Sequence, residues 1–362
     1  MLMQKGLIDV PEVRKKAFGE EPEVLRLRYD PQTSPMNTIP DDLRIGLLQI
    51  FMQYAAGARR RSGKKWTSFD PLSDSSLHQN FAFEFDLAGQ SVTCEEKDPA
   101  AGQNQHLWAE LTWPEAEERF QQVDIALLPV GAIEQHGPHL PLDTDAFDAN
   151  YLALRVAEVC SEPKPLVLPS ISYGVSYHHD DFKGTVSISN DTLAKLVYDI
   201  GISVSRNGIK KFVIINGHGG NSPALNHAAQ MINRDAHIFV CVDTGETSDV
   251  DIDALVETPN DVHAGEIETS TTLAVRPHLV KMDQARREVP QFSSRYLDFS
   301  SKRGVLWYAY TRKISRSGIM GDPTKADAEK GRKIWAAMIN HLVALVEDLK
   351  SMTLEEIHHR NY

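Results

Sequence analysis

Two segments of the sequence place acid and imidazole side chains close together, in a pattern that suits metal binding. The first contains Glu134, His136 and Asp145 within GAIEQHGPHLPLDTD, and the second contains His218 within NGHGGN. If the first segment is extended, residues two apart point to the same side, so Glu134 and His136 face one site together. A carboxylate such as that of Asp145 has two oxygens and can bridge two metal ions. Imidazole and carboxylate ligands together suit Zn, Mn or Fe, so these residues predict a metal site.

A third segment, HAGEIETS, adds His263, Glu266 and Glu268. If it is extended, alternate side chains face the same way, and the sequence leaves open which glutamate reaches the site. A single histidine or acid in a loop is more often a cap or turn residue than a ligand. Three such segments together favour a metal site over that interpretation. NGHGGN alone is also compatible with a tight turn or a phosphate loop, although it lacks the spacing of a P-loop.

The first two segments each follow a predicted buried strand, Val123–Val130 and Lys211–Ile215. In open α/β sheets, ligands bind beyond the carboxyl ends of the strands, which is where both loops would lie. Further strands and helices alternate along the chain, and this order indicates a layered α/β domain with a mostly parallel sheet. The predicted strands are Leu166–Leu168 and His237–Asp243, and the predicted helices are Asp145–Val159, Asn190–Arg206, Pro223–Arg234 and Ala326–Lys350.

The first 105 residues differ from the rest of the chain. Residues 1–40 are polar and rich in proline, Asp41–Arg61 has helical spacing, and residues 80–94 alternate as a strand or hairpin does. A basic cluster at Arg59–Lys65 is better explained as a solvated helix end than as a phosphate or RNA site. We therefore expect an N-terminal extension, residues 1–105, without metal ligands, followed by a catalytic domain, residues 106–362.

The composition excludes several classes of protein. With 38 Lys and Arg against 50 Asp and Glu, the formal net charge is −12, which argues against a general nucleic-acid or anionic-membrane binder. Three widely spaced cysteines do not form a disulfide framework or a zinc ribbon. No signal-peptide core and no run long enough for a membrane helix is visible. These features predict a soluble, cytoplasmic protein.

Several stretches of the sequence resemble the creatininase family of metal-dependent amidohydrolases. The stretches are LPVGAIEQHGPHLPLDTD, INGHGGNS and HAGEIETS, and the flanking segments Leu107–Glu115 and Gly318–Gly331 resemble the start and end of the family. The resemblance runs over about two-thirds of the chain, from Leu107 to Leu349. It implies a three-layer α/β fold with a mostly parallel central sheet.

The resemblance also implies a centre of two divalent metal ions with a bridging hydroxide. Its ligands would be Glu134, His136, His218 and a bridging Asp145. Creatinine-hydrolysing members carry Tyr-Glu after the histidine of the NGH loop, whereas this chain has Gly219-Gly220.

This difference argues against creatinine as the substrate and points to Glu268 as the remaining acidic ligand. By the same resemblance, His263 is the catalytic proton-transfer residue. Glu268 is also expected to be a catalytic residue. The family is often a homo-oligomer, including hexamers.

The polar, aromatic loop from Tyr173 to Thr185 lies over the active site in the resembled family. It offers Ser176, His178 and His179 as substrate contacts, and Gly219 of the second loop completes that set. A solvated loop remains an alternative for this segment. Ser176 is the weakest of the four because it lacks a nucleophile-elbow context.

Three histidine or aspartate residues near the first motif are expected to be structural because the resembled motif does not use them as ligands. They are His139, Asp143 and Asp148.

Three functions fit these features. The first is a dinuclear metal-dependent hydrolase of a small cyclic or amide carbonyl substrate, in which the hydroxide attacks and His263 assists proton transfer. The second is a hydrolase that opens a C–C bond in a cyclic polyol diketone of the 3-dehydro-scyllo-inosose type. The third, of another class, is a non-catalytic ligand-binding protein on the same fold.

Overall fold

The computed structural model describes residues 81–86, 91–96, 106–245, 247, 252–294, 296–297 and 307–358. The chain divides into two units, residues 1–103 and 104–362, which are described separately here. In the first unit, β1 (Phe81–Asp86) pairs with β2 (Ser91–Glu96) in an antiparallel hairpin, where the sequence predicted a strand or hairpin. The helix predicted over Asp41–Arg61 and the basic cluster at Arg59–Lys65 lie outside the described residues. The domain boundary stays a prediction.

The second unit is built on a four-stranded sheet in which every pairing is parallel. The strands are β3 (Ile125–Val130), β4 (Leu166–Val167), β5 (Lys211–Asn216) and β6 (Phe239–Val242), and their order is β4-β3-β5-β6. All of β3 and all but the last residue of β5 are buried, as expected for central parallel strands covered on both faces. The prediction of a mostly parallel central sheet is confirmed.

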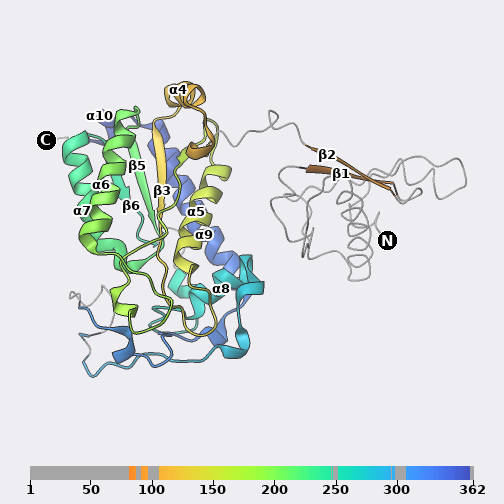
Figure 1. Cartoon of the computed structure of the whole chain (residues 1–362), viewed down its shortest axis with the longest axis vertical. Helices are drawn as coiled ribbons and strands as arrows, with labels where there is room; N and C mark the ends of the chain where they lie inside the picture. The colour runs from red at the N-terminus through yellow and green to blue at the C-terminus, as the bar shows by residue number, and fades with distance from the viewer. Residues whose placement is uncertain are drawn as a thin grey trace, which may run out of the picture. The chain divides into compact units, whose positions relative to one another are not determined.

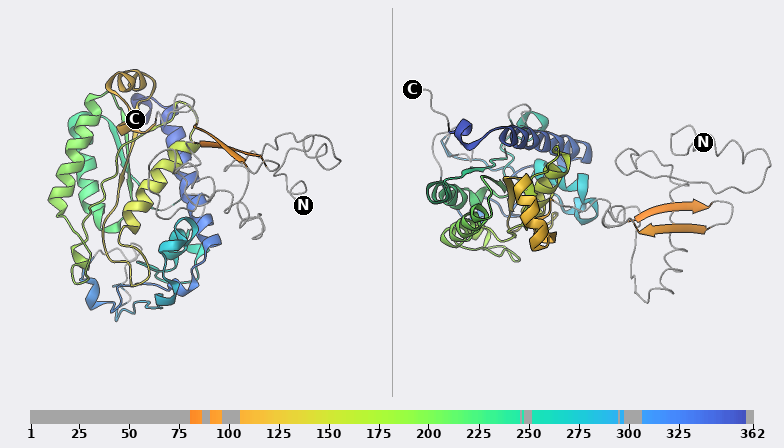
Figure 2. Two further views of the ribbon diagram at one scale, coloured as in Figure 1. Left: turned by 45° about the vertical axis from the view of Figure 1, so that its right-hand side comes forward. Right: turned by 90° about the horizontal axis from the view of Figure 1, so that it is seen from above.

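Helices cover both faces of this sheet. The crossovers between consecutive strands are α5 (Thr144–Val159), α6 (Asn190–Arg206) and α7 (Ser222–Ala236). Figure 1 shows α5 and the long α9 (Ala328–Ser351) on one face and α6 and α7 on the other, and the left view of Figure 2 shows the same arrangement. In the sheet, β4 lies on one side of β3, and β5 and β6 lie on its other side. Because the crossovers have the same hand, the one toward β4 and those toward β5 and β6 place their helices on opposite faces. The predicted three-layer α/β fold is therefore confirmed.

The part of the second unit that the structure describes also contains the α-helices α4, α8 and α10. Thr112 is the N-cap of α4 (Trp113–Gln122) and forms a capping box with Glu115. Near the other end of the sheet, α8 (Glu266–Val275) packs against α9, and the short α10 (Leu354–Ile357) lies near the C-terminus. Among the helices that the structure describes, none is both long and apolar enough to span a membrane.

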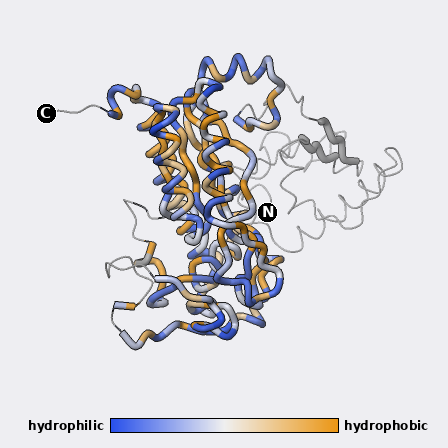
Figure 3. The backbone as a smooth tube through the Cα atoms, turned by 60° about the vertical axis from the view of Figure 1, so that its left-hand side comes forward, coloured by the Kyte–Doolittle hydropathy of each residue, from blue (hydrophilic) through white to orange (hydrophobic). Residues whose placement is uncertain are grey.

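The hydrophobic core lies between the sheet and its helices. Its largest fully buried side chains include Phe212 and Ile214 of β5 and Leu127 and Leu128 of β3. Figure 3 shows the hydrophobic residues concentrated along the strands and helices of this region, whereas the loops beyond the strand ends are more hydrophilic. Polar groups that are buried among the loops beyond the strand ends therefore need a specific explanation.

The strand order defines where a site can form. The chain reverses its direction of growth between β3 and β5, and the crevice beyond such a switch point is the usual ligand site of an open α/β sheet. At the end of β5, a Cβ added to Gly217 would lie 2.4 Å from the backbone oxygen of Asp145. Only glycine permits this approach, so the first turn of α5 can lie against the end of β5. The loops after β3 and β5 thus meet at the start of α5.

Candidate metal centre and active site

Four of the predicted metal ligands lie together at this switch point. Glu134 and His136 follow β3, His218 follows β5, Asp145 lies in the first turn of α5, and all four are buried. The Oε2 atom of Glu134 is 3.2 Å from Nε2 of His218, whose Nδ1 is 3.1 Å from Oδ2 of Asp145. The other oxygen of Asp145, Oδ1, is 2.9 Å from Nε2 of His136. Asp145 therefore faces two histidines with its two oxygens, as a bridging carboxylate must.

The third motif reaches the same cluster from the start of α8. The Nδ1 atom of His263 lies 3.5 Å from Oε1 of Glu134, and Oε2 of Glu268 lies 3.8 Å from Nε2 of His136. The condition that this segment is extended is wrong, because α8 begins at Glu266. The sequence does not predict this helix because the segment is polar and follows a glycine. At 3.6 residues per turn, residues two apart in a helix point about 200° apart, so the two glutamates face opposite sides.

The carboxylate of Glu266 forms its hydrogen bonds with residues outside the cluster. Its carboxylate accepts hydrogen bonds from the backbone N–H groups of Glu257 and Thr258, from the Thr258 hydroxyl and from the Lys330 ammonium group. The Oε2 atom of Glu268 accepts a hydrogen bond from the backbone N–H of Ala264, and the same oxygen lies 3.8 Å from Nε2 of His136. This geometry favours Glu268 over Glu266 as the acid of the third motif.

The buried acids hold two of the histidines in their charged form. Burial lowers the pKa of His136, but Asp145 and Glu268 outweigh burial and raise it well above its usual value. Burial also opposes the charged form of His218, and Glu134 and Asp145 raise its pKa to about 9. The pKa of Asp145 is held far below its usual value, because these two histidines outweigh its burial.

The other histidines are kept neutral. Burial lowers the pKa of His178 to about 4 and that of His179 to about 3, and it holds the pKa of His263 well below its usual value. Burial also raises the pKa of Glu268 to about 7. Neutral imidazole is the form that binds a metal ion, so His136 and His218 would have to lose a proton when a cation binds between them and the carboxylates.

The cluster fits a metal centre because its oxygens lack hydrogen-bond partners. Both carboxylate oxygens of Glu134 and Oδ2 of Asp145 are buried without a hydrogen bond, although ring nitrogens lie 3.1–3.5 Å from them. Ligand atoms about 2.1 Å from one metal ion lie roughly 3.0–3.4 Å from one another in octahedral or tetrahedral geometry. The nitrogen–oxygen contacts therefore also have the spacing of ligand atoms around shared cations. Sets that could hold an ion include Glu134-His136-Asp145 and His136-His263-Glu268.

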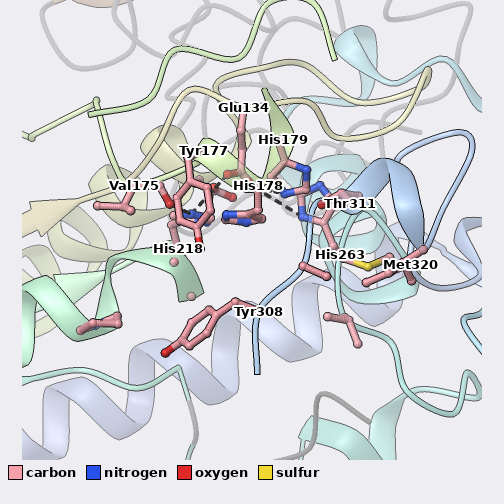
Figure 4. Close-up of a pocket in the computed structure, with 18 of the residues that line it drawn as sticks. Glu134, Val175, Tyr177, His178, His179, His218, His263, Tyr308, Thr311 and Met320 are labelled. Carbon is pink, nitrogen blue, oxygen red and sulfur yellow. Dashed lines mark hydrogen bonds and ion pairs between the residues drawn. The ribbon is translucent and has the colours of Figure 1, made fainter. Parts of the chain in front are cut away.

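A cavity of about 530 Å³ opens beside this cluster. Figure 4 shows Glu134 with the rings of His178, His179, His218 and His263, and Tyr308 on the other side of the cavity. Part of one wall comes from the segment Trp307–Ile314, which the sequence did not suggest because it contains none of the motifs, and Met320 adds to it from the flanking segment Gly318–Gly331. That wall consists of Trp307, Tyr308, Ala309, Thr311, Ile314 and Met320.

The predicted substrate contacts occupy different places around the cavity. His178 and Gly219 line it, and the ring of His178 stacks on that of His218 with centroids 5.7 Å apart. Ser176 is buried behind the lining, with its Oγ 3.4 Å from Nε2 of His218. His179 lies in the cluster itself, with its Nε2 3.3 Å from Oε1 of Glu134.

The residues expected to be structural have partners away from the cavity, with one exception. His139 lies within hydrogen-bonding distance of the Thr269 hydroxyl, and Asp143 pairs with Arg276 at 2.9 Å. Asp148 is buried beside the cluster, where burial and then the charge of Glu268 raise its pKa well above its usual value. A protonated Asp148 carries no charge there, which fits a structural role.

Comparison with known proteins agrees with this class of site, a metal-dependent hydrolase centre on an α/β fold. The family model described as creatininase, creatinine amidohydrolase, matches residues 109–346. The chain therefore belongs to the creatininase family, and we identify it as a metal-dependent hydrolase, which excludes the non-catalytic alternative.

Individual relatives differ in their named activities. A mycofactocin precursor peptide peptidase of Mycobacterium tuberculosis is 35% identical over 230 residues, which cover 61% of this chain and 83% of that protein. A 3-dehydro-scyllo-inosose hydrolase of Thermotoga maritima is 27% identical over 262 residues, covering 66% and 82%. A crystal structure of creatinine amidohydrolase superimposes with a TM-score of 0.57 at 26% identity, covering 68% of this chain and 99% of that chain.

Proposed function

We propose that the chain is a dinuclear metal-dependent hydrolase that cleaves the C–N bond of an amide, in a small cyclic compound or a short peptide. The observation that carries the proposal is the group of three buried carboxylate oxygens without a hydrogen bond, both oxygens of Glu134 and Oδ2 of Asp145, beside the imidazoles of the cluster. Two divalent ions, Zn, Mn or Fe, would be held by Glu134, His136, Asp145, His218 and Glu268. When bound, such ions polarise a carbonyl group and lower the pKa of water.

The other side chains supply binding and proton transfer. The Nδ1 atom of His263 lies 3.5 Å from Oε1 of Glu134 and faces the cluster, a position from which it can take a proton and return it to the leaving nitrogen. His178 and Gly219 border the space in which the substrate would lie, and Ser176 supports His218 from behind. Buried surroundings exclude competing water from the reacting carbonyl.

An amide is favoured as the substrate because of the names of two of the relatives above. A peptidase and a creatinine amidohydrolase both act on a C–N bond. The aromatic residues at the cavity, including the exposed Tyr177 and Tyr308, offer flat surfaces for a substrate larger than a single small ring. We also propose that the active form is a homo-oligomer in the cytoplasm and that residues 1–105 add no ligand.

A second candidate function is opening of a C–C bond in a cyclic polyol diketone. It is favoured by the Thermotoga maritima relative, whose similarity extends over 262 residues. Both reactions begin with attack on a carbonyl carbon, so the same ligand set serves either one.

A substrate screen tests the proposal. The purified full-length chain is loaded with Zn²⁺ or Mn²⁺, and cyclic amides, formamides, short peptides and inosose-type diketones are offered in parallel. We expect amine release from an amide, loss of this activity with a chelator, and no activity in a Glu134→Gln variant. Opening of a diketone without amide cleavage would support the second function instead. A protein without bound metal whose activity resists chelation would contradict both.

A further inference from the structure

Gln135 lies between two proposed ligands, Glu134 and His136, yet its own side chain is buried and fully bonded. Its Oε1 accepts a hydrogen bond from the backbone N–H of Gly137 at 2.9 Å, and its Nε2 donates to the backbone oxygen of Gly318 at 3.1 Å. A backbone N–H can only donate and a carbonyl can only accept, so the amide cannot be turned over. The position of each atom of this amide is therefore fixed by two independent partners.

The amide nitrogen of Gln135 determines which nitrogen of His179 carries hydrogen. It lies 2.8 Å from Nδ1 of His179, and because an amide nitrogen only donates, that Nδ1 must accept. A neutral His179 then carries its hydrogen on Nε2, the atom that lies 3.3 Å from Oε1 of Glu134. His179 thus presents an N–H group, not a lone pair, to the cluster.

The main chain of the same residue determines the opposite state for His263. Its Nε2 lies 2.7 Å from the backbone oxygen of Gln135, which can only accept, so this nitrogen carries the hydrogen. The amide nitrogen of Gln135 is also near, at 2.9 Å, but donation from it would leave two acceptor atoms in repulsive contact at 2.7 Å. The neutral ring therefore keeps its lone pair on Nδ1, which faces Glu134.

Both hydrogens of the Gln135 amide are then used, one on His179 and one on Gly318. Only a glycine at position 318 leaves space for the Gln135 side chain, because a Cβ there would lie 1.8 Å from its Oε1. Gly318 also has φ 89, a conformation that other residues rarely adopt. Two separate features at one position therefore accommodate the Gln135 side chain.

We propose that Gln135 is a positioning residue that sets the tautomers of His179 and His263 in opposite senses toward the cluster. The inference rests on the proposed function and extends it to the atoms involved. Of the two rings, only His263 can accept and return a proton through Nδ1. His179 is excluded as a metal ligand through Nε2 and instead offers a hydrogen bond to an oxygen of the substrate.

Nitrogen-15 NMR of the Zn²⁺-loaded, histidine-labelled full chain tests the tautomers directly. In the wild-type protein we expect Nδ1 of His179 unprotonated and Nε2 protonated, with the signals assigned by their loss in His179→Asn. In Gln135→Glu a carboxylate replaces the donor, so Nδ1 of His179 should become protonated. The matched control Gln284→Glu makes the same change of charge at an exposed position and should leave the His179 signals unchanged.

Steady-state kinetics on the same proteins separates positioning from general damage. For Gln135→Glu we expect kcat to fall by roughly 10²–10⁴-fold, the range for lost acid–base catalysis or a wrong histidine tautomer, with KM and metal content little changed. Gln135→Met removes the donor without adding charge and should lower kcat in the same direction.

Two results would overturn the proposal. One is a protonated Nδ1 of His179 in the wild-type protein, a measurement that does not depend on any variant folding. The other is loss of both metal ions in the Gln135 variants together with activity, which would make the residue merely structural. A wild-type protein that fails to bind metal or hydrolyse any substrate would instead refute the proposed function, and the NMR result would still decide the tautomers.

Discussion

Replacing Asp145 with asparagine is the most direct perturbation of the cluster. Its two carboxylate oxygens lie 2.9 Å from His136 and 3.1 Å from His218, so it is the residue placed between the two proposed ions. Asparagine keeps the size and shape of the side chain but removes its negative charge. If Asp145 bridges two cations, both ions should bind more weakly and activity should be lost.

The expected size of the effect follows from the lost charge. Two unit charges about 4 Å apart interact by roughly 4 kcal/mol at an effective dielectric constant near 20. At about 1.4 kcal/mol for each tenfold change, this corresponds to a roughly 10³-fold loss of metal affinity. Zn²⁺ at about 100 times its Kd would stabilise the wild-type protein by about 2.7 kcal/mol. For a domain of this size that is a rise in Tm of about 5–10 °C, which should nearly vanish in the variant.

Thermal unfolding with buffered Zn²⁺, combined with elemental analysis, measures both quantities. The matched control is Asp143→Asn in the same loop, because Asp143 is half-exposed and pairs with Arg276 away from the cluster. We expect the control to keep the full Zn²⁺-dependent rise in Tm. An Asp145→Asn protein that also keeps this rise and its full metal content would refute the bridging role.

Three other changes test separate parts of the site. Glu268→Gln should lower metal content, whereas Glu266→Gln should lower Tm with metal retained, and elemental analysis of the pair would show the reverse if the roles are exchanged. His263→Ala should keep both ions and lose turnover by roughly 10²–10⁴-fold, as measured by kcat, and a fully active variant would remove it from the mechanism. A chain truncated to begin near Gln105 should bind metal as the full chain does; loss of metal from a folded truncation would place ligands in the extension.

The position of the cluster could be predicted because it depends on strand order and motif position alone. Buried apolar runs before GAIEQH and NGHGGN predicted β3 and β5, and adjacent parallel strands bring the loops after them to one edge. Glu134, Asp145 and His218 therefore meet without any knowledge of side-chain packing. Their assignment as ligands came from the resemblance and stays a proposal.

The role of α8 could not be predicted from periodicity. Its buried residues are mostly Thr and Ser, including Thr269, Ser270 and Thr272, so the helix lacks the apolar stripe by which a helix is recognised. Without the helix, the sequence could not show that Glu266 and Glu268 face opposite sides.

The places of the paired histidines were also beyond sequence reasoning. His178 and His179 belong to a single turn of 3₁₀ helix, so consecutive side chains diverge by about 120°. Both rings border the cavity, but that of His178 stacks on His218 whereas that of His179 lies 3.3 Å from Glu134, and nothing in the order of two identical residues distinguishes them. The sequence also gives no signal for the role of Gln135, because a glutamine between two possible ligands has no metal chemistry of its own.

The Gly219-Gly220 pair links the cluster to the choice of substrate. A Cβ at Gly219 would meet no atom within 4 Å, so the tyrosine carried there by creatinine-hydrolysing relatives would project into space that is open in this chain. A Cβ at Gly220 would lie 2.4 Å from Nε2 of His218, so a glutamate could enter only if that ring moved. This agrees with the proposal that Glu268 supplies the acidic ligand, and Gly219 lines the cavity. Open space at Gly219 and the aromatic residues Tyr177 and Tyr308 at the cavity fit the proposed substrate class, an amide in a small cyclic compound or a short peptide.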